Sequence, residues 1–171
     1  NLLITYDKKD ADFAQKILSE SNIASEDILL GISPGSVWAT KRWTADGFAK
    51  LIDLLIRHLK AKVILFGGPT DQEIAVEIVH LCRENPINLS GKTTIKQLTA
   101  LISKCRLFIT NDSGPMHIAV SQKIPVVAIF GPTTPEMGFA PYSNDAIIVQ
   151  KNLPCRPCSL HGGHRCPKKH F

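Results

Sequence analysis

This sequence of 171 residues lacks several common signatures, and each absence excludes a class of protein. No apolar run reaches the roughly 18 residues that a membrane-spanning helix needs, and we find no signal peptide. The dinucleotide-binding fingerprint G-x-G-x-x-G does not occur. Gly91-Lys92-Thr93 could end a P-loop, but that motif requires glycine where Pro86 stands. The sequence therefore predicts neither a membrane span nor a standard nucleotide-binding motif.

Acidic residues are absent from the end of the chain. Residues 1–150 carry equal numbers of basic and acidic side chains, so the net charge of +5 comes entirely from residues 151–171. Because the excess is confined to the tail, it does not predict a nucleic-acid-binding surface. A basic tail could contact phosphate head groups or an acidic partner, and a solvated terminal segment is the simpler alternative.

The five cysteines fall into two groups. Cys82 and Cys105 occupy apolar helical patterns, where a buried, reduced thiol is expected, and this favours a reducing, cytoplasmic setting. The tail has Cys155-x2-Cys158, a spacing typical of metal sites, with further candidate ligands at Cys166, His161, His164 and His170. A zinc site, a disulfide and a reduced structural loop all remain open, and we assign no metal ligand.

Apolar runs of strand length alternate with amphipathic helical patterns along most of the chain. Strands are predicted over 2–6, 28–33, 62–66, 87–89, 106–110, 125–130 and 146–149, and helices over 10–20, 45–59, 71–84 and 94–104. We divide the chain into a connecting segment (1–27), a main domain (28–150) and the basic tail (151–171). The alternation predicts a Rossmann-like α/β domain, a mainly parallel sheet with helices on both faces.

Right-handed crossovers bring the loops after parallel strands to one edge of the sheet, where ligands bind. The segment Asn111–His117 reads there as strand end, tight turn and helix start. Asp112 or Ser113 can cap the helix, Gly114 permits close approach of a ligand, and Pro115 suits the first turn. Such a turn can bind phosphate at the positive end of the helix, although an ordinary capped turn would have the same pattern. Lys41, after an earlier strand, could neutralise a phosphate.

These segments resemble a known family. Ser33-Pro-Gly-Ser36, Ala39–Trp43, Phe66-Gly-Gly68, Asn111–His117 and Pro125–Thr133 look like the donor-binding half of the lipopolysaccharide heptosyltransferases, glycosyltransferase family 9. The resemblance extends over residues 28–171 in consistent order. The cysteine-containing tail is most similar to the heptosyltransferase II group within that family.

The resemblance implies the C-terminal half of a GT-B enzyme that holds ADP-L-glycero-D-manno-heptose. By matching position, Ser36 and Lys41 would meet the diphosphate, with Lys41 stabilising the leaving group, and Thr93 and Thr94 would lie near the adenosine. The sugar and phosphates would be held by Asp112, by the backbone at Ser113, Gly114 and Met116, and by His117. A histidine in a first helical turn is otherwise a surface or capping group. The ribose-binding glutamate of some members has no clear counterpart in residues 69–73.

The family's reaction is an inverting transfer in which an acceptor hydroxyl attacks the anomeric carbon, assisted by a carboxylate base. That base belongs to the N-terminal domain, so this chain is expected to bind donor without transferring it. The acceptor would be a lipid-linked oligosaccharide at the cytoplasmic side of the inner membrane, with peripheral membrane contact and no required cofactor. The alternatives are a non-catalytic nucleotide-binding or partner-docking module, or a GT-B transferase for another nucleotide sugar.

Overall fold

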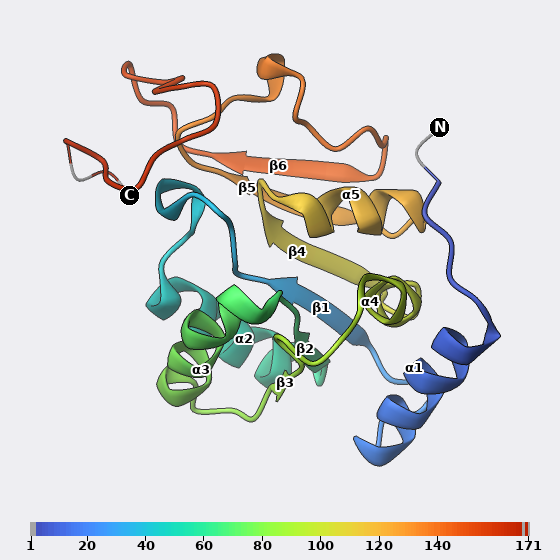
Figure 1. Cartoon of the computed structure of the whole chain (residues 1–171). Coiled ribbons are helices and arrows are strands. Elements are labelled where there is room, and N and C mark those ends of the chain that lie inside the picture. The colour runs from blue at the N-terminus through green and yellow to red at the C-terminus, as the bar shows by residue number, and fades with distance from the viewer. Residues whose placement is uncertain (1–2, 169, 171) are drawn as a thin grey trace.

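A computed structural model describes residues 3–168 and residue 170. Six strands form one parallel sheet in the order β3-β2-β1-β4-β5-β6 (Figure 1). The strands are β1 (Leu29–Ser33), β2 (Lys62–Leu65), β3 (Ile87–Asn88), β4 (Leu107–Asn111), β5 (Val126–Phe130) and β6 (Ala146–Gln150). The helices are α1 (Lys8–Glu20), α2 (Ala45–Leu59), α3 (Gln72–Leu81), α4 (Ile95–Ile102) and α5 (Gly114–Ser121), with short 3-10 turns at Ala39–Lys41, Pro69–Asp71 and Pro135–Met137. The predicted α/β class is confirmed.

Two hydrophobic cores lie on opposite faces of the sheet, because successive strand residues point to alternate faces. One core is built with side chains of α1, α4 and α5, among them Ala14, Leu101 and Met116. The other is built with side chains of α2 and α3, among them Phe48 and Ile78. All five residues of β1 are buried, as expected for a central strand covered on both faces.

Local capping signals fix the starts of two helices. Thr44 caps α2 by accepting a hydrogen bond from the N–H of Gly47. Thr94 and Gln97 form a reciprocal capping box at the start of α4. These side chains satisfy backbone donors that a helix leaves unpaired in its first turn. Helix α2 begins at the predicted residue, and α4 begins one residue after the predicted start and ends at Ile102 instead of 104.

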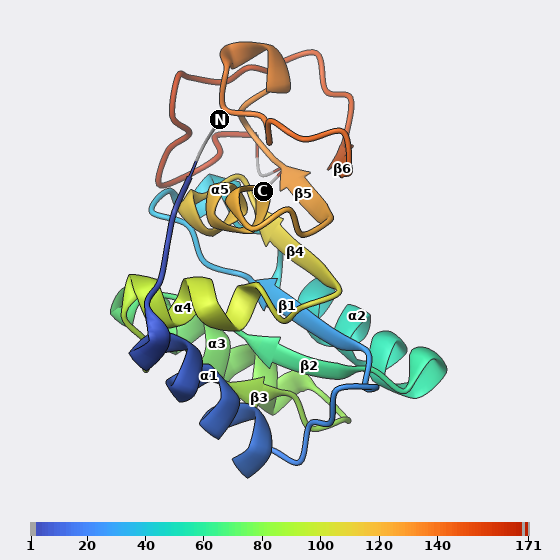
Figure 2. The same ribbon diagram turned by 90° about the vertical axis from the view of Figure 1, so that its right-hand side faces the viewer.

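The N-terminal segment departs from the prediction. Residues 3–7 form no strand, and Leu2 lies outside the described residues. The sheet ends at β3 and β6, and this segment runs beside the helices instead, where the Gln122 side chain donates to the carbonyl of Ile4 at 2.7 Å. Helix α1 then packs along α4 (Figure 2) and buries Ala14 and Leu18 in the first core.

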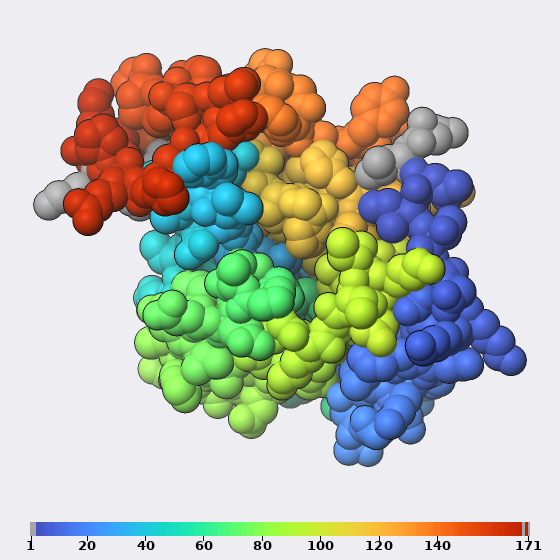
Figure 3. Space-filling model, viewed as in Figure 1, coloured from blue at the N-terminus to red at the C-terminus, as the bar shows by residue number. Residues whose placement is uncertain are grey.

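The described part of the tail, residues 151–168 and residue 170, has no helix or strand. It leaves β6 and folds back over the loop that follows β1, as the red and cyan regions of Figure 3 show. No helix among the described residues is long and apolar enough to cross a membrane.

Candidate functional site

The strand order places a switch point between β1 and β4. The chain leaves β1 toward β2 on one side and leaves β4 toward β5 on the other. The loops after these two strands therefore diverge and leave a crevice at the carboxyl edge of the sheet, which is the usual ligand site of such folds. Both loops carry residues that the sequence singled out, Ser36 and Lys41 in one and Asp112 to His117 in the other.

Asn111, the last residue of β4, holds the β1 loop closed. Its Nδ2 donates to the carbonyl of Pro34 at 2.6 Å, and its Oδ1 accepts from the N–H of Trp43 at 3.0 Å. Asn111 is fully buried, so these bonds satisfy backbone groups that water cannot reach. The two ends of the loop 34–43 are thus tied to the strand that leads into Asp112.

Asp112 is the centre of a buried polar cluster. Its Oδ2 accepts from Lys41 Nζ at 2.6 Å and from Thr133 Oγ1 at 2.7 Å. The Asp112 and Lys41 side chains are only 4% and 9% exposed, and Thr133 is fully buried. Lys41 Nζ also lies 5.5 Å from the centre of the Phe139 ring. Loops after three strands, β1, β4 and β5, therefore meet at one carboxylate.

This arrangement refines two predicted roles. The sequence assigned Lys41 and Asp112 to different parts of a ligand, and the structure shows that they also bind each other. An ammonium group has three N–H donors, and the Asp112 contact occupies one of them. Lys41 can therefore still bind an anion, while the buried pair avoids leaving either charge without a partner.

No side chain caps the N-terminus of α5 within the described residues. Ser113 is the N-cap residue but makes no side-chain capping bond. Its hydroxyl instead approaches the carbonyl of Asn111 and the hydroxyl of Thr110, each at 3.3 Å. The expected capping by Asp112 or Ser113 is therefore wrong, because both side chains have other partners. Pro115 has no N–H group, and the Met116 N–H already donates to the Ser113 carbonyl at 3.1 Å, so the predicted contact of the Met116 backbone with a ligand is not supported. The N–H of Gly114, the first residue of the helix, can still bind an anion.

Gly114 faces open space at the same helix end. A Cβ atom built on this glycine would meet nothing within 4 Å, and its φ is not in the left-handed region. The fold itself does not require glycine there. The space beside the backbone is what a ligand needs to approach it. Of the neighbouring predicted residues, Met116 is fully buried in the core and His117 is partly exposed.

Thr93 and Thr94 lie farther along the same edge, after β3, on the other side of β1 from Asp112. The Thr94 hydroxyl is occupied in the α4 capping box, whereas Thr93 is partly exposed. The turn is anchored to the loop after β2 because the N–H of Gly91 donates to the carbonyl of Gly67 at 2.9 Å. The predicted residues therefore share an edge but form two separate groups.

Ser36 is buried in the β1 loop, and its carbonyl accepts from Arg42 Nε at 2.8 Å. In the part of the chain that the structure describes, no hydrogen bond of the Ser36 hydroxyl is recorded. This hydroxyl is therefore free to bind a ligand.

The tail meets the site at Thr40 and Thr133. The Thr40 hydroxyl donates to the carbonyl of Gly163 at 2.9 Å and accepts from its N–H at 2.8 Å. Arg156 donates to the carbonyl of Thr133 at 2.5 Å. Beside these contacts lies a cavity of about 360 Å³, which is lined by Thr40 and Pro132 and, from the tail, by Cys155, Cys158 and Cys166.

The cysteines are all free thiols. Burial raises the pKa of Cys105 to about 12 and that of Cys82 to about 11, where Asp53 adds a smaller effect. Burial, followed by the neighbouring Cys155, also raises the pKa of Cys158. Within residues 3–168 and 170, no three Cys, His, Asp or Glu side chains are grouped so as to hold a metal ion. The tail disulfide considered from the sequence is not formed.

The sequence analysis assigned no individual role in the site to Thr133, Asn111, Thr40 or Arg156. Thr133 follows β5 at the ligand-binding edge, so its place in the strand pattern was a usable signal. Asn111 was only part of a motif, and its loop-closing role depends on Pro34 and Trp43, far away in sequence. Thr40 carries no local signal, because its partner lies 123 residues away.

Comparison with known proteins matches residues 4–168 to glycosyltransferase family 9 (heptosyltransferase). Lipooligosaccharide heptosyltransferase 2 of Campylobacter jejuni is 43% identical over 148 residues, 83% of this chain and 45% of that protein. Lipopolysaccharide heptosyltransferase 2 of Salmonella typhimurium is 35% identical over 77% of this chain and 39% of that protein.

Solved structures of similar proteins share this fold. A family 9 glycosyl transferase from Veillonella parvula superposes with a TM-score of 0.84 and 38% identity, over 88% of this chain and 43% of that one. The E. coli ADP-heptose LPS heptosyltransferase II gives a TM-score of 0.77 and 28% identity, over 95% of this chain and 47% of that one. This chain thus spans less than half the length of these relatives. The fold, the motifs and these matches together lead to one conclusion: the chain belongs to glycosyltransferase family 9, the heptosyltransferases.

Proposed function

We propose that this chain is the donor-binding, C-terminal half of a GT-B enzyme that transfers heptose from ADP-L-glycero-D-manno-heptose to the inner core of lipopolysaccharide. The observation that carries this proposal is the buried cluster of Lys41, Asp112 and Thr133 beside the open start of α5. A cation and a helix N-terminus at one crevice suit a diphosphate. Relatives named for heptose transfer support the choice of sugar.

In the proposed complex the chain stabilises the leaving group. Lys41 and the backbone N–H of Gly114 at the start of α5 bind the diphosphate, and the Ser36 hydroxyl adds a donor. As the glycosidic bond breaks, negative charge grows on the ADP oxygens, and donors fixed before the reaction stabilise that charge. Asp112 accepts hydrogen bonds from sugar hydroxyls, and His117 contacts the sugar or a phosphate. Thr93 and Thr94 lie on the adenosine side.

We assign the carboxylate base to the other half of the enzyme. The isolated chain is therefore proposed to bind donor without transferring it. The acceptor is a lipid-linked oligosaccharide, reached by peripheral contact at the cytoplasmic face of the inner membrane. Exposed Lys168 and Arg165 in the tail supply positive charge for that contact, while Lys169, which was included in the basic tail, lies outside the described residues. The proposed domain division remains 1–27, 28–150 and 151–171.

A transfer assay tests this assignment. The chain and the full-length parent protein are each incubated with ADP-heptose and heptose-deficient lipopolysaccharide, and ADP release is measured. We expect turnover only with the parent protein, and donor binding with both. Turnover by the isolated chain would place the base within it and overturn the division of labour. Donor binding with no turnover by the parent would favour a non-catalytic binding module.

A further inference from the structure

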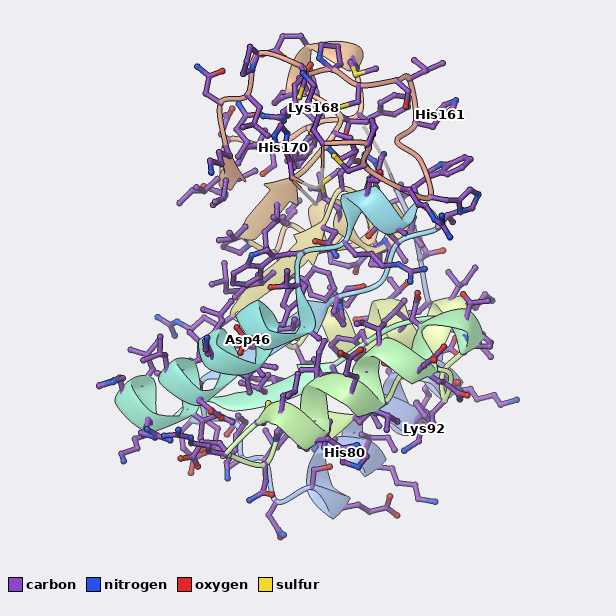
Figure 4. All side chains as sticks on the ribbon, turned by 90° about the vertical axis from the view of Figure 1, so that its left-hand side faces the viewer. Asp46, His80, Lys92, His161, Lys168 and His170 are labelled. Carbon is purple, nitrogen blue, oxygen red and sulfur yellow. The ribbon has the colours of Figure 1, made fainter. Side chains whose placement is uncertain are left out.

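Lys41 and Thr133 donate hydrogen bonds to Asp112, and the tail contacts the loop that carries each of them. Thr40 precedes Lys41 in the β1 loop, and Thr133 lies in the loop after β5. Each loop is joined to the tail by more than one hydrogen bond. In Figure 4, His161, Lys168 and His170 mark the end of the molecule where this segment lies, away from Lys92 and His80.

Thr40 is joined to the tail by three hydrogen bonds to one residue. Its N–H donates to the Gly163 carbonyl at 3.0 Å, its hydroxyl donates to the same carbonyl at 2.9 Å, and that hydroxyl accepts from the Gly163 N–H at 2.8 Å. Thr40 is only 6% exposed. Breaking such a buried, reciprocal contact leaves several polar groups unpaired, which is more costly than the loss of one exposed bond.

The approach of the tail is close enough to demand glycine. Gly162 has a φ of +90°, in the region that other residues rarely adopt. A Cβ atom at Gly162 would lie 3.2 Å from Thr40 Oγ1 and 3.3 Å from Lys41 Cγ. The space between Gly162 and the methylene stem of Lys41 is therefore too small for a side chain without adjustment, and this close approach restricts a lysine that would otherwise have many rotamers.

A second set of contacts fixes the other partner of Asp112. The Arg156 guanidinium donates to the Thr133 carbonyl at 2.5 Å, to the Lys151 carbonyl at 2.6 Å and to Gln150 Oε1 at 2.9 Å. The N–H of Cys158 donates to the Pro132 carbonyl at 2.9 Å. The planar fork of arginine can hold several acceptors in fixed directions, which a lysine cannot do.

We propose that Thr40 and Arg156 are positioning residues: through the tail they hold Lys41 and Thr133 around Asp112, so that the Lys41 ammonium is pre-set for the diphosphate of the donor. The diphosphate part of this inference rests on the proposed function, whereas the positioning part rests on the contacts alone. A pre-set donor loses less conformational freedom on binding and so binds more tightly.

The test compares two variants of Thr40. Thr40→Val keeps the shape of the side chain but removes the hydroxyl, and Thr40→Ser keeps the hydroxyl. Calorimetric titration with ADP and with adenosine separates the diphosphate contribution from the rest of the site. We expect Thr40→Val to raise the Kd for ADP about tenfold and to leave adenosine binding unchanged. Thr40→Ser should bind ADP like the unmodified chain. Thr99→Val is the matched control, since Thr99 is also buried and its hydroxyl donates to a carbonyl, that of Ile95, inside α4.

Arg156→Lys provides a second variant that keeps the charge. Its control is Arg57→Lys, at an exposed ion pair with Glu84.

Hydrogen exchange without ligand completes the design, because it reports on the loop whether or not ADP binds. We expect faster exchange around Lys41 in Thr40→Val and around Thr133 in Arg156→Lys, and in neither control. Unchanged exchange and unchanged ADP affinity would overturn the proposal, as would equal losses for ADP and adenosine. Failure of the unmodified chain to bind ADP would count against the proposed function, and exchange would still decide the positioning role.

Discussion

Lys41 and Asp112, 71 residues apart in sequence, form a buried ion pair with 2.6 Å between Nζ and Oδ2. The pair brings together the loops on both sides of the switch point. It also means that a ligand anion and Asp112 compete for the same ammonium group, or share it. The consequences of this relationship can be measured.

Replacement of Asp112 by Asn should separate nucleotide binding from sugar binding. The change removes the negative charge beside Lys41 while keeping the shape, so the ammonium is freer to bind phosphate. We expect ADP affinity to be kept or increased and the affinity for ADP-heptose to fall below that of ADP. Calorimetry with the two ligands measures both. Parallel loss of both affinities would show that Asp112 acts mainly by holding Lys41.

Gly114→Ala should affect the ligand and spare the fold. The added methyl group meets no protein atom within 4 Å, so the free energy of unfolding should change by less than about 0.5 kcal/mol. The methyl group enters the space beside the first turn of α5, where we place the phosphates, and the clash should weaken ADP binding about tenfold. Thermal unfolding and titration are run on the same preparation. Unimpaired binding by a stable variant would move the phosphates away from this helix end.

Asn111→Ala should destabilise the domain. The change leaves the Pro34 carbonyl and the Trp43 N–H without their buried partner. Unsatisfied buried groups of this kind cost about 3 kcal/mol together. Urea unfolding measures the loss, and Asn144→Ala, at an exposed position, is the control. A cost for Asn111→Ala no larger than that of the control would mean that the loop 34–43 is held by other contacts.

Thiol labelling at pH 8 should distinguish the two groups of cysteines. Cys105 and Cys82, with pKa values raised to about 12 and about 11, are almost wholly protonated at that pH and therefore unreactive. Cys158 is exposed and should be modified first, even though its pKa is also raised. Mass spectrometry after iodoacetamide treatment gives the order. Protection of the tail thiols that a chelator removes would instead reveal a bound metal.

The raised pKa of Cys105 also has a consequence for stability. The neutral thiol is favoured in the folded state, so the unfolded chain loses its proton at a lower pH. The free energy of unfolding should therefore fall as the pH rises above the ordinary thiol pKa of about 8.5. Cys105→Ala should lack this contribution to the slope. Identical slopes for the two proteins between pH 8 and pH 10 would contradict the assigned pKa.

Most of the fold could be predicted because it depends on local patterns. Continuous apolar runs specify the buried strands, and Thr44 and Thr94 specify helix starts through their own first turns. Helix α3 shows the limit. It ends at Leu81 instead of the predicted 84, because the Asp53 carboxylate, from α2, accepts from the N–H groups of Arg83 and Glu84.

For the candidate site, the sequence allows a set of residues to be proposed, but it does not predict the contacts among them. Lys41 and Asp112 were identified by their positions after strands, and Thr40 could not be, since its partner Gly163 lies in a tail without regular structure. Contacts between loops that are distant in sequence depend on the order and twist of the whole sheet, and no local sequence pattern encodes them.

The central claim is that the crevice binds ADP through Lys41, and titration calorimetry of the chain with ADP and UDP, without added metal, tests it most directly. We predict selective binding of ADP, and a Kd at least about tenfold higher for Lys41→Ala, because a charge-assisted contact to phosphate is lost. Lys50→Ala, at an exposed ion pair with Asp46, should bind ADP like the unmodified chain. Equal binding of ADP and UDP, or full affinity in Lys41→Ala, would contradict the account.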